Sequence, residues 1–200
     1  MIQRRHFLNQ SAAWLGLALT GLSARAADKE WTTLLDPGRT TRLDDWAQLG
    51  EGNWSVLDQT LQGKDGKAGF LVSKQSYKDF ELRVEFWADE AANSGVFIRA
   101  ADPKKIGADS SYEVNIFDKR PDPSYGTGGI PNVAKVEQPG PKAANQWNTY
   151  EITAQGDHLV VVLNGRKTVD VRDGKFAQGP FALQSAGGTI RFRRIQIRQI

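Results

Sequence analysis

Charged, amide and aromatic side chains with the properties of a sugar-binding site alternate with apolar residues along three neighbouring segments. Aromatic rings stack on the apolar faces of pyranose rings, and charged or amide groups hydrogen-bond the sugar hydroxyls. The residues in question are Arg83, Glu85, Trp87, Phe97, Arg99, Glu113, Asn115 and Asp118. Their spacing predicts that they share the polar faces of adjacent strands and line a carbohydrate site. The alternative is an exposed sheet face with cross-strand salt bridges.

Period-two alternation predicts the strands that position these residues. The clearest strand covers 80–87, where every second residue is apolar; further strands are expected over 94–101 and 112–117. On the first, the inward residues are Phe80, Leu82, Val84 and Phe86. On the others, Val96 and Ile98 oppose Phe97 and Arg99, and Tyr112, Val114 and Ile116 oppose Glu113, Asn115 and Phe117. Arg99, Glu113, Asn115 and Asp118 are therefore expected to converge.

The remaining chain continues as antiparallel strands, with no convincing helix. Strands are expected over 147–154, 158–163, 166–171, 180–184 and 189–197. Asn164-Gly165 predicts a type I′ hairpin turn, because this turn needs positive φ at both central residues. The apolar phase changes near Arg193-Arg194, which predicts a β-bulge. Strands at this density predict an all-β sandwich of two antiparallel sheets in a single domain, residues 28–200.

Residues 119–145 do not follow this pattern. The segment is rich in Pro and Gly, and it comes directly after the polar strand face that ends at Asp118. Loops of this length inside a compact domain are usually functional or disordered. We therefore expect it to fold over the polar face and convert that face into a cleft.

The residue types narrow the possible chemistry. The chain has no Cys, so disulfides, thiolate metal sites and cysteine nucleophiles are excluded. His158, the one histidine after residue 27, is expected at a turn or on the surface, and no G-x-S-x-G motif supports a serine hydrolase. Glu113, Asn115 and Asp118 offer hard oxygen ligands, so a Ca²⁺, Mg²⁺ or Mn²⁺ site stays open.

The first 27 residues have the properties of an export signal. Arg4-Arg5 precede a short apolar run, 12–22, and Ala24-Arg25-Ala26 fits a signal cleavage site. This predicts a twin-arginine signal peptide and a periplasmic or secreted protein, with no membrane association after cleavage. The alternative is an N-terminal anchor, but the run is shorter than the roughly 20 residues that span a bilayer.

The charge balance of the rest of the chain argues against nucleic acid as a partner. Three of the 26 Lys and Arg residues and none of the 23 acidic residues lie within the first 27, so the remainder carries 23 of each sign. A chain of near-zero net charge lacks the sequence-independent attraction that nucleic-acid binders use.

Nine segments, in order, resemble the 3-keto-disaccharide hydrolase domain family, also described as a 3-keto-glucoside lyase and hydratase domain. The resemblance covers essentially all of 28–200. The segments are 31–36 WTTLLD, 53–56 NWSV, 77–82 YKDFEL, 93–99 NSGVFIR, 112–118 YEVNIFD, 147–152 WNTYEI, 163–165 LNG, 181–184 FALQ and 191–193 RFR. The resemblance implies a concanavalin-like jelly roll, in agreement with the strand pattern.

The resemblance also implies an activity, the cleavage of glycosides already oxidised to a ketone at C3. The ketone acidifies the C2 proton, a base removes it, and the C1 substituent leaves by β-elimination; water then adds to the glycal. Glu113 could be the base, Arg99 or a divalent metal could stabilise the enolate oxygen, and Asp118 could assist the leaving group. The substrate-binding candidates are Arg83, Glu85, Trp87, Phe97 and Asn115. Alternatives are a non-catalytic carbohydrate-binding module and a structural role.

Overall fold

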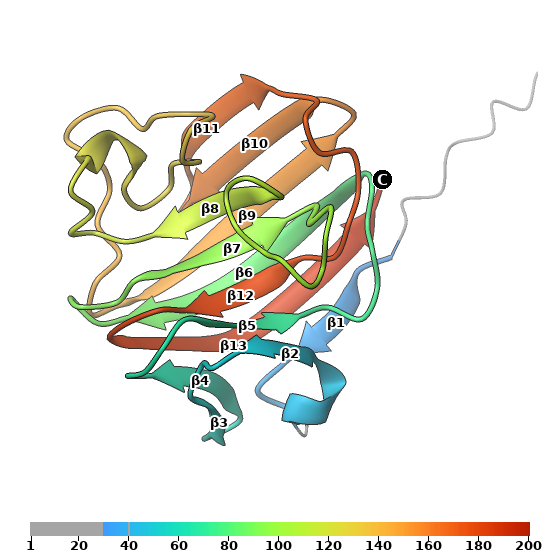
Figure 1. The fold of residues 1–200 in the computed structure, drawn as a ribbon, viewed down its shortest axis with the longest axis vertical. Helices are drawn as coiled ribbons and strands as arrows, with labels where there is room; N and C mark the ends of the chain where they lie inside the picture. The colour runs from blue at the N-terminus through green and yellow to red at the C-terminus, as the bar shows by residue number, and fades with distance from the viewer. Residues whose placement is uncertain (1–29, 40) are drawn as a thin grey trace, which may run out of the picture.

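Two antiparallel β-sheets stacked face to face form the protein (Figure 1). The computed structural model describes residues 30–39 and 41–200, so the expected signal peptide lies outside the described residues. The larger sheet has the order β11 (Arg166–Arg172), β10 (His158–Leu163), β9 (Trp147–Gln155), β6 (Phe80–Ala88), β13 (Thr189–Gln199), β4 (Thr60–Lys64) and β3 (Trp54–Leu57), with β1 (Thr32–Leu35) also pairing β13. The smaller sheet has the order β2 (Ala47–Gly50), β5 (Gly69–Val72), β12 (Ala182–Ser185), β7 (Ser94–Ile98) and β8 (Tyr112–Ile116).

The predicted all-β fold is confirmed. Within the described ranges the only helical segments are two single 3₁₀ turns, Leu43–Asp45 and Pro123–Tyr125. None of the described residues forms a helix long and apolar enough to cross a membrane.

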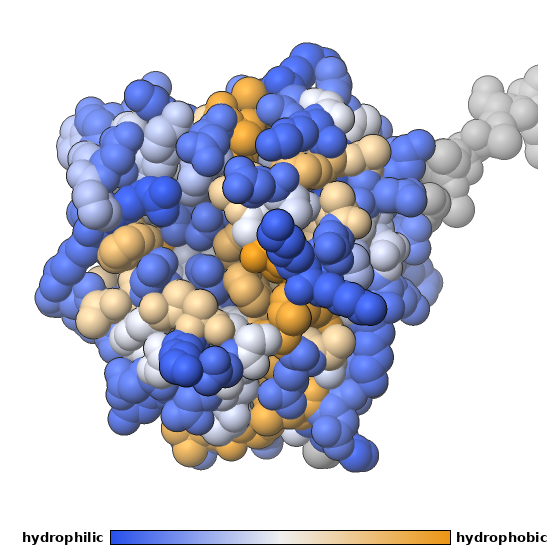
Figure 2. Space-filling view, in the orientation of Figure 1, coloured by the Kyte–Doolittle hydropathy of each residue, from blue (hydrophilic) through white to orange (hydrophobic). Residues whose placement is uncertain are grey.

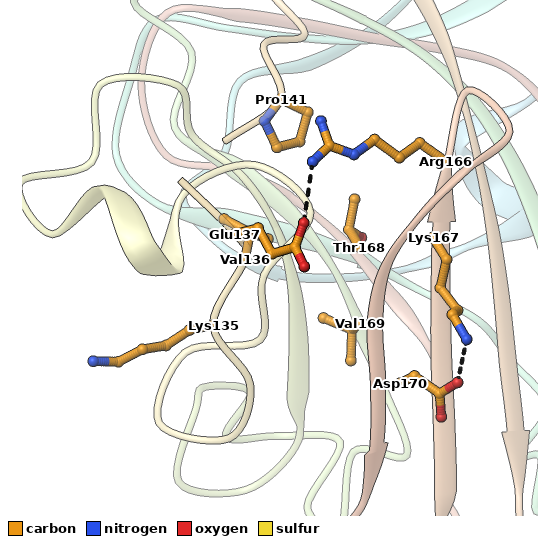
Figure 3. A pocket seen from close by; sticks show the side chains of 9 residues that line it. All are labelled: Lys135, Val136, Glu137, Pro141, Arg166, Lys167, Thr168, Val169 and Asp170. Atoms are coloured by element: carbon orange, nitrogen blue, oxygen red, sulfur yellow. Dashed lines mark hydrogen bonds and ion pairs between the residues drawn. The ribbon is translucent and has the colours of Figure 1, made fainter. Parts of the chain in front are cut away.

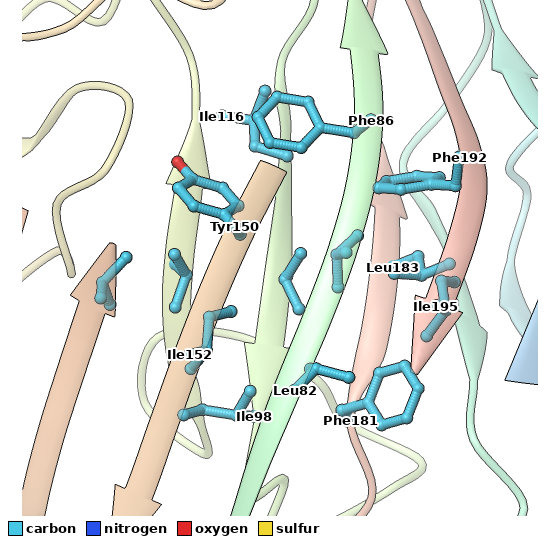
Figure 4. Packing of buried hydrophobic residues seen from close by; sticks show 14 of the residues in the cluster. Leu82, Phe86, Ile98, Ile116, Tyr150, Ile152, Phe181, Leu183, Phe192 and Ile195 are labelled. Carbon is cyan, nitrogen blue, oxygen red and sulfur yellow. The ribbon is translucent and has the colours of Figure 1, made fainter. Parts of the chain in front are cut away.

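The core lies between the two sheets because alternate residues of each strand are apolar and point inward. Leu82 and Phe86 of β6 and Tyr150 of β9 meet Ile98 of β7 and Leu183 of β12 (Figure 4). All five are fully buried. Burying one such side chain stabilises the fold by about 1.5–3 kcal/mol. The inner faces are therefore committed to packing, and any ligand site must use an outer face, an edge or a loop.

Local features predicted from the sequence are present at the hairpin and the bulge. Asn164 and Gly165 have φ of 50° and 80° between β10 and β11. The register of β13 against β6 shifts between Phe192 and Arg194.

The expected strand 94–101 is shorter than predicted. β7 ends at Ile98, and Arg99 has a φ of 53°, outside the strand conformation. The period-two alternation therefore ends at Ile98. The prediction that Arg99 lies on the same strand face as Phe97 is wrong.

The long segment between β8 and β9 contains no further strand and packs along the free edge of β8. The backbone N–H of Asn115 donates to the Gly129 carbonyl, and the Gly128 N–H donates to the Asn115 carbonyl. Tyr112, Val114 and Ile116 point into the core, so Glu113 and Asn115 project from the outer face of the smaller sheet. The loop is thus fixed beside these two side chains.

Candidate functional site

Arg83, Glu85 and Trp87 do not join the other candidates, because β6 belongs to the larger sheet and Glu113 to the smaller one. The two outer faces point in opposite directions. Glu85 pairs with Arg193 at 2.7 Å and with Arg194 at 2.9 Å. The expectation of one shared site is wrong for these three residues, and the cross-strand salt bridges of the alternative interpretation are what the structure contains.

On this outer face, arginine side chains stack on tryptophan rings. The Arg83 guanidinium lies 4.4 Å from the centre of the Trp31 ring, and that of Arg191 lies 5.2 Å from the Trp87 ring. One face of the Trp87 ring is therefore already occupied by a cation. Stacking of a sugar on that face would require Arg191 to move.

Arg99 is a structural residue and does not lie on the outer face. It is 0% exposed, and its guanidinium donates hydrogen bonds to the carbonyls of Lys78, Gly156 and Phe176 at 2.6–3.3 Å. It also pairs with Asp79 at 3.1 Å. The expected contact of Arg99 with a substrate is wrong, because its donors are used to join three chain segments.

Asp118 is likewise engaged within the protein. Its carboxylate accepts hydrogen bonds from the Thr127 hydroxyl at 2.5 Å and from the backbone N–H groups of Ala143 and Ala144 at 2.9 and 3.0 Å. These bonds tie the middle of the long loop, at Thr127, and its last residues to the end of β8. Asp118 therefore orders the loop and has little capacity left for a metal or a leaving group.

The proposed metal ligands Glu113, Asn115 and Asp118 are thus not gathered as a free oxygen cluster. Over 30–39 and 41–200, no group of three or more acidic or histidine side chains is placed to hold a metal ion.

Glu113 lies over Gly95, and this arrangement is the centre of the candidate site. In the register of β7 and β8, Phe97 pairs with Glu113 and Gly95 pairs with Asn115. A methyl group built on Gly95 would lie 3.1 Å from the Glu113 Cγ and 3.2 Å from its Oε1. The absence of a side chain at 95 is therefore what allows the Glu113 carboxyl to fold across β7.

Two amide side chains beside Gly95 each carry an oxygen that has no hydrogen-bond partner within the described part of the chain. These oxygens are Asn115 Oδ1 and Gln184 Oε1, and both atoms are buried. The β7–β12 register, carried one residue beyond Leu183↔Val96, places Gln184 beside Gly95 on the side opposite Asn115. Glu113, Asn115 and Gln184 are therefore brought together around one glycine.

The orientation of the Asn115 amide is fixed by its other atom. Its Nδ2 donates to the Tyr125 carbonyl at 2.7 Å, and a carbonyl accepts only from a donor. Tyr125 belongs to the segment at the free edge of β8, so Oδ1 faces away from that segment. Buried polar groups without a partner are rare, and they cost stability.

The electrostatics of Glu113 suit proton transfer near neutral pH. Burial raises the pKa of the Glu113 carboxyl to about 7, and the charge of Arg120 acts in the opposite direction. The Arg120 guanidinium makes no hydrogen bond or ion pair with any residue that the structure describes. A cation close enough to influence Glu113 is thus free to meet a ligand.

Phe97 shares the outer face with Glu113 but is buried in a small cluster. It packs edge-on against Phe70 with ring centres 5.3 Å apart, and Ile106 from the β7–β8 connection also packs on the cluster. Phe97 is 2% exposed. Its expected stacking on a sugar is replaced by packing, and the half-buried Phe70 is the more accessible ring.

Separate pockets lie at the margins of this face. The smaller sheet is nearer the viewer in Figure 1, and Figure 2 shows polar and apolar residues interspersed over that side. A pocket of 280 Å³ lies between the long loop and β11, where Arg166 approaches Glu137 at 3.6 Å (Figure 3). None of the residues proposed from the sequence lines it.

Sequence reasoning missed three residues of this site: Gly95, Arg120 and Gln184. Strand alternation could have found Gln184, since Leu183 is a core residue and its neighbour must face outward. Gly95 precedes two apolar strand residues, and a strand glycine often marks a close approach of other groups. Nothing in the sequence pattern indicated that Arg120, within an irregular loop, would lie near Glu113.

Solved structures of other proteins share the fold of this chain. A candidate glycosyl hydrolase from Parabacteroides distasonis is 16% identical, with a TM-score of 0.74 over 85% of this chain and 94% of its own. A second from the same organism is 24% identical, with a TM-score of 0.67 over 86% and 100%. The carbohydrate-binding module CBM66 of Bacillus subtilis is 19% identical, with a TM-score of 0.61 over 86% and 98%.

The family comparison covers nearly the whole described chain. No protein of curated function gives a significant match. The model of the 3-keto-alpha-glucoside-1,2-lyase-like domain matches residues 30–198. The resemblance seen in the nine sequence segments is thereby confirmed, and the chain belongs to the 3-keto-alpha-glucoside-1,2-lyase-like domain family.

Proposed function

We propose that this protein cleaves 3-keto-glucosides by removing the C2 proton, with Glu113 as the base. The observation that carries the proposal is the position of the Glu113 carboxyl, held across Gly95 on an outer sheet face, with its pKa raised to about 7 by burial. A general base works best when its pKa lies near the operating pH. Membership of the 3-keto-alpha-glucoside-1,2-lyase-like family supports this choice of substrate class.

The elimination can be written with the residues around Gly95. Glu113 takes the C2 proton, the C2–H electron pair forms the C1=C2 double bond through the enolate, and the C1–O bond breaks. Arg120 replaces Arg99 as the cation for the developing charge on the C3 oxygen, because its guanidinium is free within the described residues and lies close to Glu113. Protonated Glu113 returns its proton to the departing oxygen. Addition of water to the glycal completes net hydrolysis.

Asp118 and Arg99 act as positioning residues in this scheme. Asp118 ties the long loop to the end of β8, and Arg120 lies two residues further along that loop. Arg99 fixes the start of the β7–β8 connection, which packs on Phe97 through Ile106. Neither residue needs to touch the substrate.

The test is turnover of a 3-keto-α-glucoside by purified protein and by Glu113→Gln. The variant keeps the size of the side chain but cannot act as a base, so turnover should fall by about 10²- to 10⁴-fold. Glu151→Gln, on the outer face of the opposite sheet, is the matched control and should retain activity. Binding of the sugar without release of aglycone would instead identify a carbohydrate-binding module. Normal turnover by Glu113→Gln would remove Glu113 from the mechanism.

We further propose that the protein reaches the periplasm by twin-arginine export. The supporting observation is Arg4-Arg5 ahead of a short apolar run and a cleavage-like Ala24-Arg25-Ala26. Replacing Arg4 and Arg5 together by Lys should leave precursor in the cytoplasm, because lysine lacks the planar guanidinium donors. Fractionation of cells expressing each form checks this, and unchanged periplasmic accumulation would contradict it.

A further inference from the structure

The two unpartnered amide oxygens beside Glu113 indicate what the site recognises. Asn115 Oδ1 and Gln184 Oε1 are buried and accept no hydrogen bond from the described protein. Both side chains also carry NH₂ donors, and that of Asn115 is already used on the Tyr125 carbonyl. What the pair lacks is donors, so a complementary ligand must bring O–H or N–H groups to it.

The strand geometry places both amide residues beside Gly95, over which the Glu113 carboxyl lies. Asn115 turns its backbone N–H and carbonyl toward Gly129 and Gly128, so it forms a non-hydrogen-bonded pair with Gly95 of β7. In such pairs the Cα atoms lie about 4.5 Å apart, closer than in hydrogen-bonded pairs. Gln184 approaches Gly95 from the other neighbouring strand, and its carbonyl accepts from the Ser94 hydroxyl at 2.6 Å. The two amides thus flank the position at which Glu113 would meet C2.

We propose that Asn115 and Gln184 form an acceptor pair that selects substrates with a free hydroxyl group at C2. This inference rests on the proposed function, which places C2 at the Glu113 carboxyl. The C2 hydroxyl is attached to the carbon that loses its proton, so it is the substrate donor that must lie nearest to the base. A C3 ketone oxygen is itself an acceptor and is excluded from the pair. The resulting substrate class is the 2-hydroxy glycosides; 2-deoxy and 2-O-alkyl glycosides are rejected.

If Asn115 and Gln184 act as this acceptor pair, removing one amide should raise thermal stability and weaken binding of the C2 hydroxyl. An unpartnered buried acceptor destabilises the free protein, and its hydrogen bond is made only when a ligand arrives. Replacing Gln184 by Met, which has a similar shape and no amide, should therefore raise the melting temperature by about 2–4 °C while weakening recognition of the hydroxyl. A purely structural glutamine would show no such opposite effects.

The experiment uses unreactive probes, so it is independent of turnover. Methyl α-glucoside and methyl 2-deoxy-α-glucoside lack the C3 ketone and cannot undergo the elimination. Their affinities for the wild-type protein, Gln184→Met and Asn115→Leu are measured by NMR titration, together with melting temperatures. Gln62→Met is the matched control, because Gln62 lies on the opposite sheet and accepts a hydrogen bond from Arg191.

The expected result is that wild-type protein binds the 2-hydroxy probe about tenfold more tightly than the 2-deoxy probe. Gln184→Met should lose most of this ratio and keep its affinity for the 2-deoxy probe, while Gln62→Met keeps the wild-type ratio. Equal affinity of wild-type protein for both probes, including failure to bind either, overturns the proposal even if the variants do not fold. A wild-type ratio in both Gln184→Met and Asn115→Leu also overturns it. Loss of turnover with an intact ratio would refute only the proposed elimination.

Discussion

Replacing Glu113 by Gln should stabilise the protein above neutral pH and have little effect in acid. Burial raises the pKa of the folded-state carboxyl to about 7 from an ordinary value of 4.5. Between these two values the unfolded chain ionises Glu113 while the folded protein keeps it protonated. The folded state therefore binds more protons there, and stability falls as pH rises through this window. The amide introduced by Glu113→Gln does not titrate, so the stability of the variant does not fall over this pH window.

The magnitude follows from the difference between the two pKa values. It corresponds to about 3 kcal/mol at pH 8, because one pKa unit is worth about 1.4 kcal/mol. For a domain of this size that is a difference of about 6–12 °C in melting temperature. The protonated Glu113 carboxyl and the amide that replaces it in the variant are both uncharged, so the two proteins should be nearly equal in stability near pH 4.5.

The assay is thermal unfolding of wild type and Glu113→Gln at intervals between pH 4.5 and 8.5. The difference in melting temperature between the two proteins should increase with pH and become constant above about pH 7. Glu151→Gln reports the effect of removing an exposed carboxylate. A gap that is constant across the range would refute the reasoning, because it would mean that Glu113 has the same pKa in the folded and unfolded protein.

Three other perturbations probe the parts around Glu113. Gly95→Ala should slow turnover roughly fourfold, because the added methyl would push the Glu113 carboxyl by a few tenths of an ångström and a misplacement of 1 Å can cost about 10²-fold in rate. Gly107 has open space around it, so Gly107→Ala should keep the wild-type rate in the same assay. Arg120→Met should raise the Glu113 pKa further, so the acidic limb of the rate profile, where the base becomes protonated, should move to higher pH; an unmoved limb would contradict the assigned contact. Arg99→Met should destabilise the fold by about 3–5 kcal/mol in chemical denaturation, because it removes a buried guanidinium and leaves Asp79 unpaired; a loss of activity with unchanged stability would show that Arg99 has a role at the substrate after all.

The fold could be read from the sequence because strand alternation is a local property. The residues of β6 alternate between fully buried positions and half-buried or exposed ones as predicted, and the bulge near Arg194 follows from a phase change within one strand. Which strands share a sheet is not a local property. Arg83 of β6 and Glu113 of β8 carry the same alternation signal, yet they lie on sheets whose outer faces point apart.

The site was only partly predictable for a related reason. Glu113 follows from strand phase, whereas Arg99 does not, because a single residue with positive φ ends β7 and turns the side chain inward. Gly95 and Gln184 become meaningful only when the β12–β7–β8 order is known. Arg120 lies in a loop whose course depends on the hydrogen bonds of Asp118.

The position of β13 has a consequence for how the chain folds. The last strand of the sequence lies inside the larger sheet, between β6 on one side and β4 and β1 on the other. Until residues 189–199 have left the ribosome, β6 and β4 have no strand between them, and the larger sheet remains split. Pairings between such distant segments also close slowly. Folding of the larger sheet must therefore follow synthesis of residues 189–199.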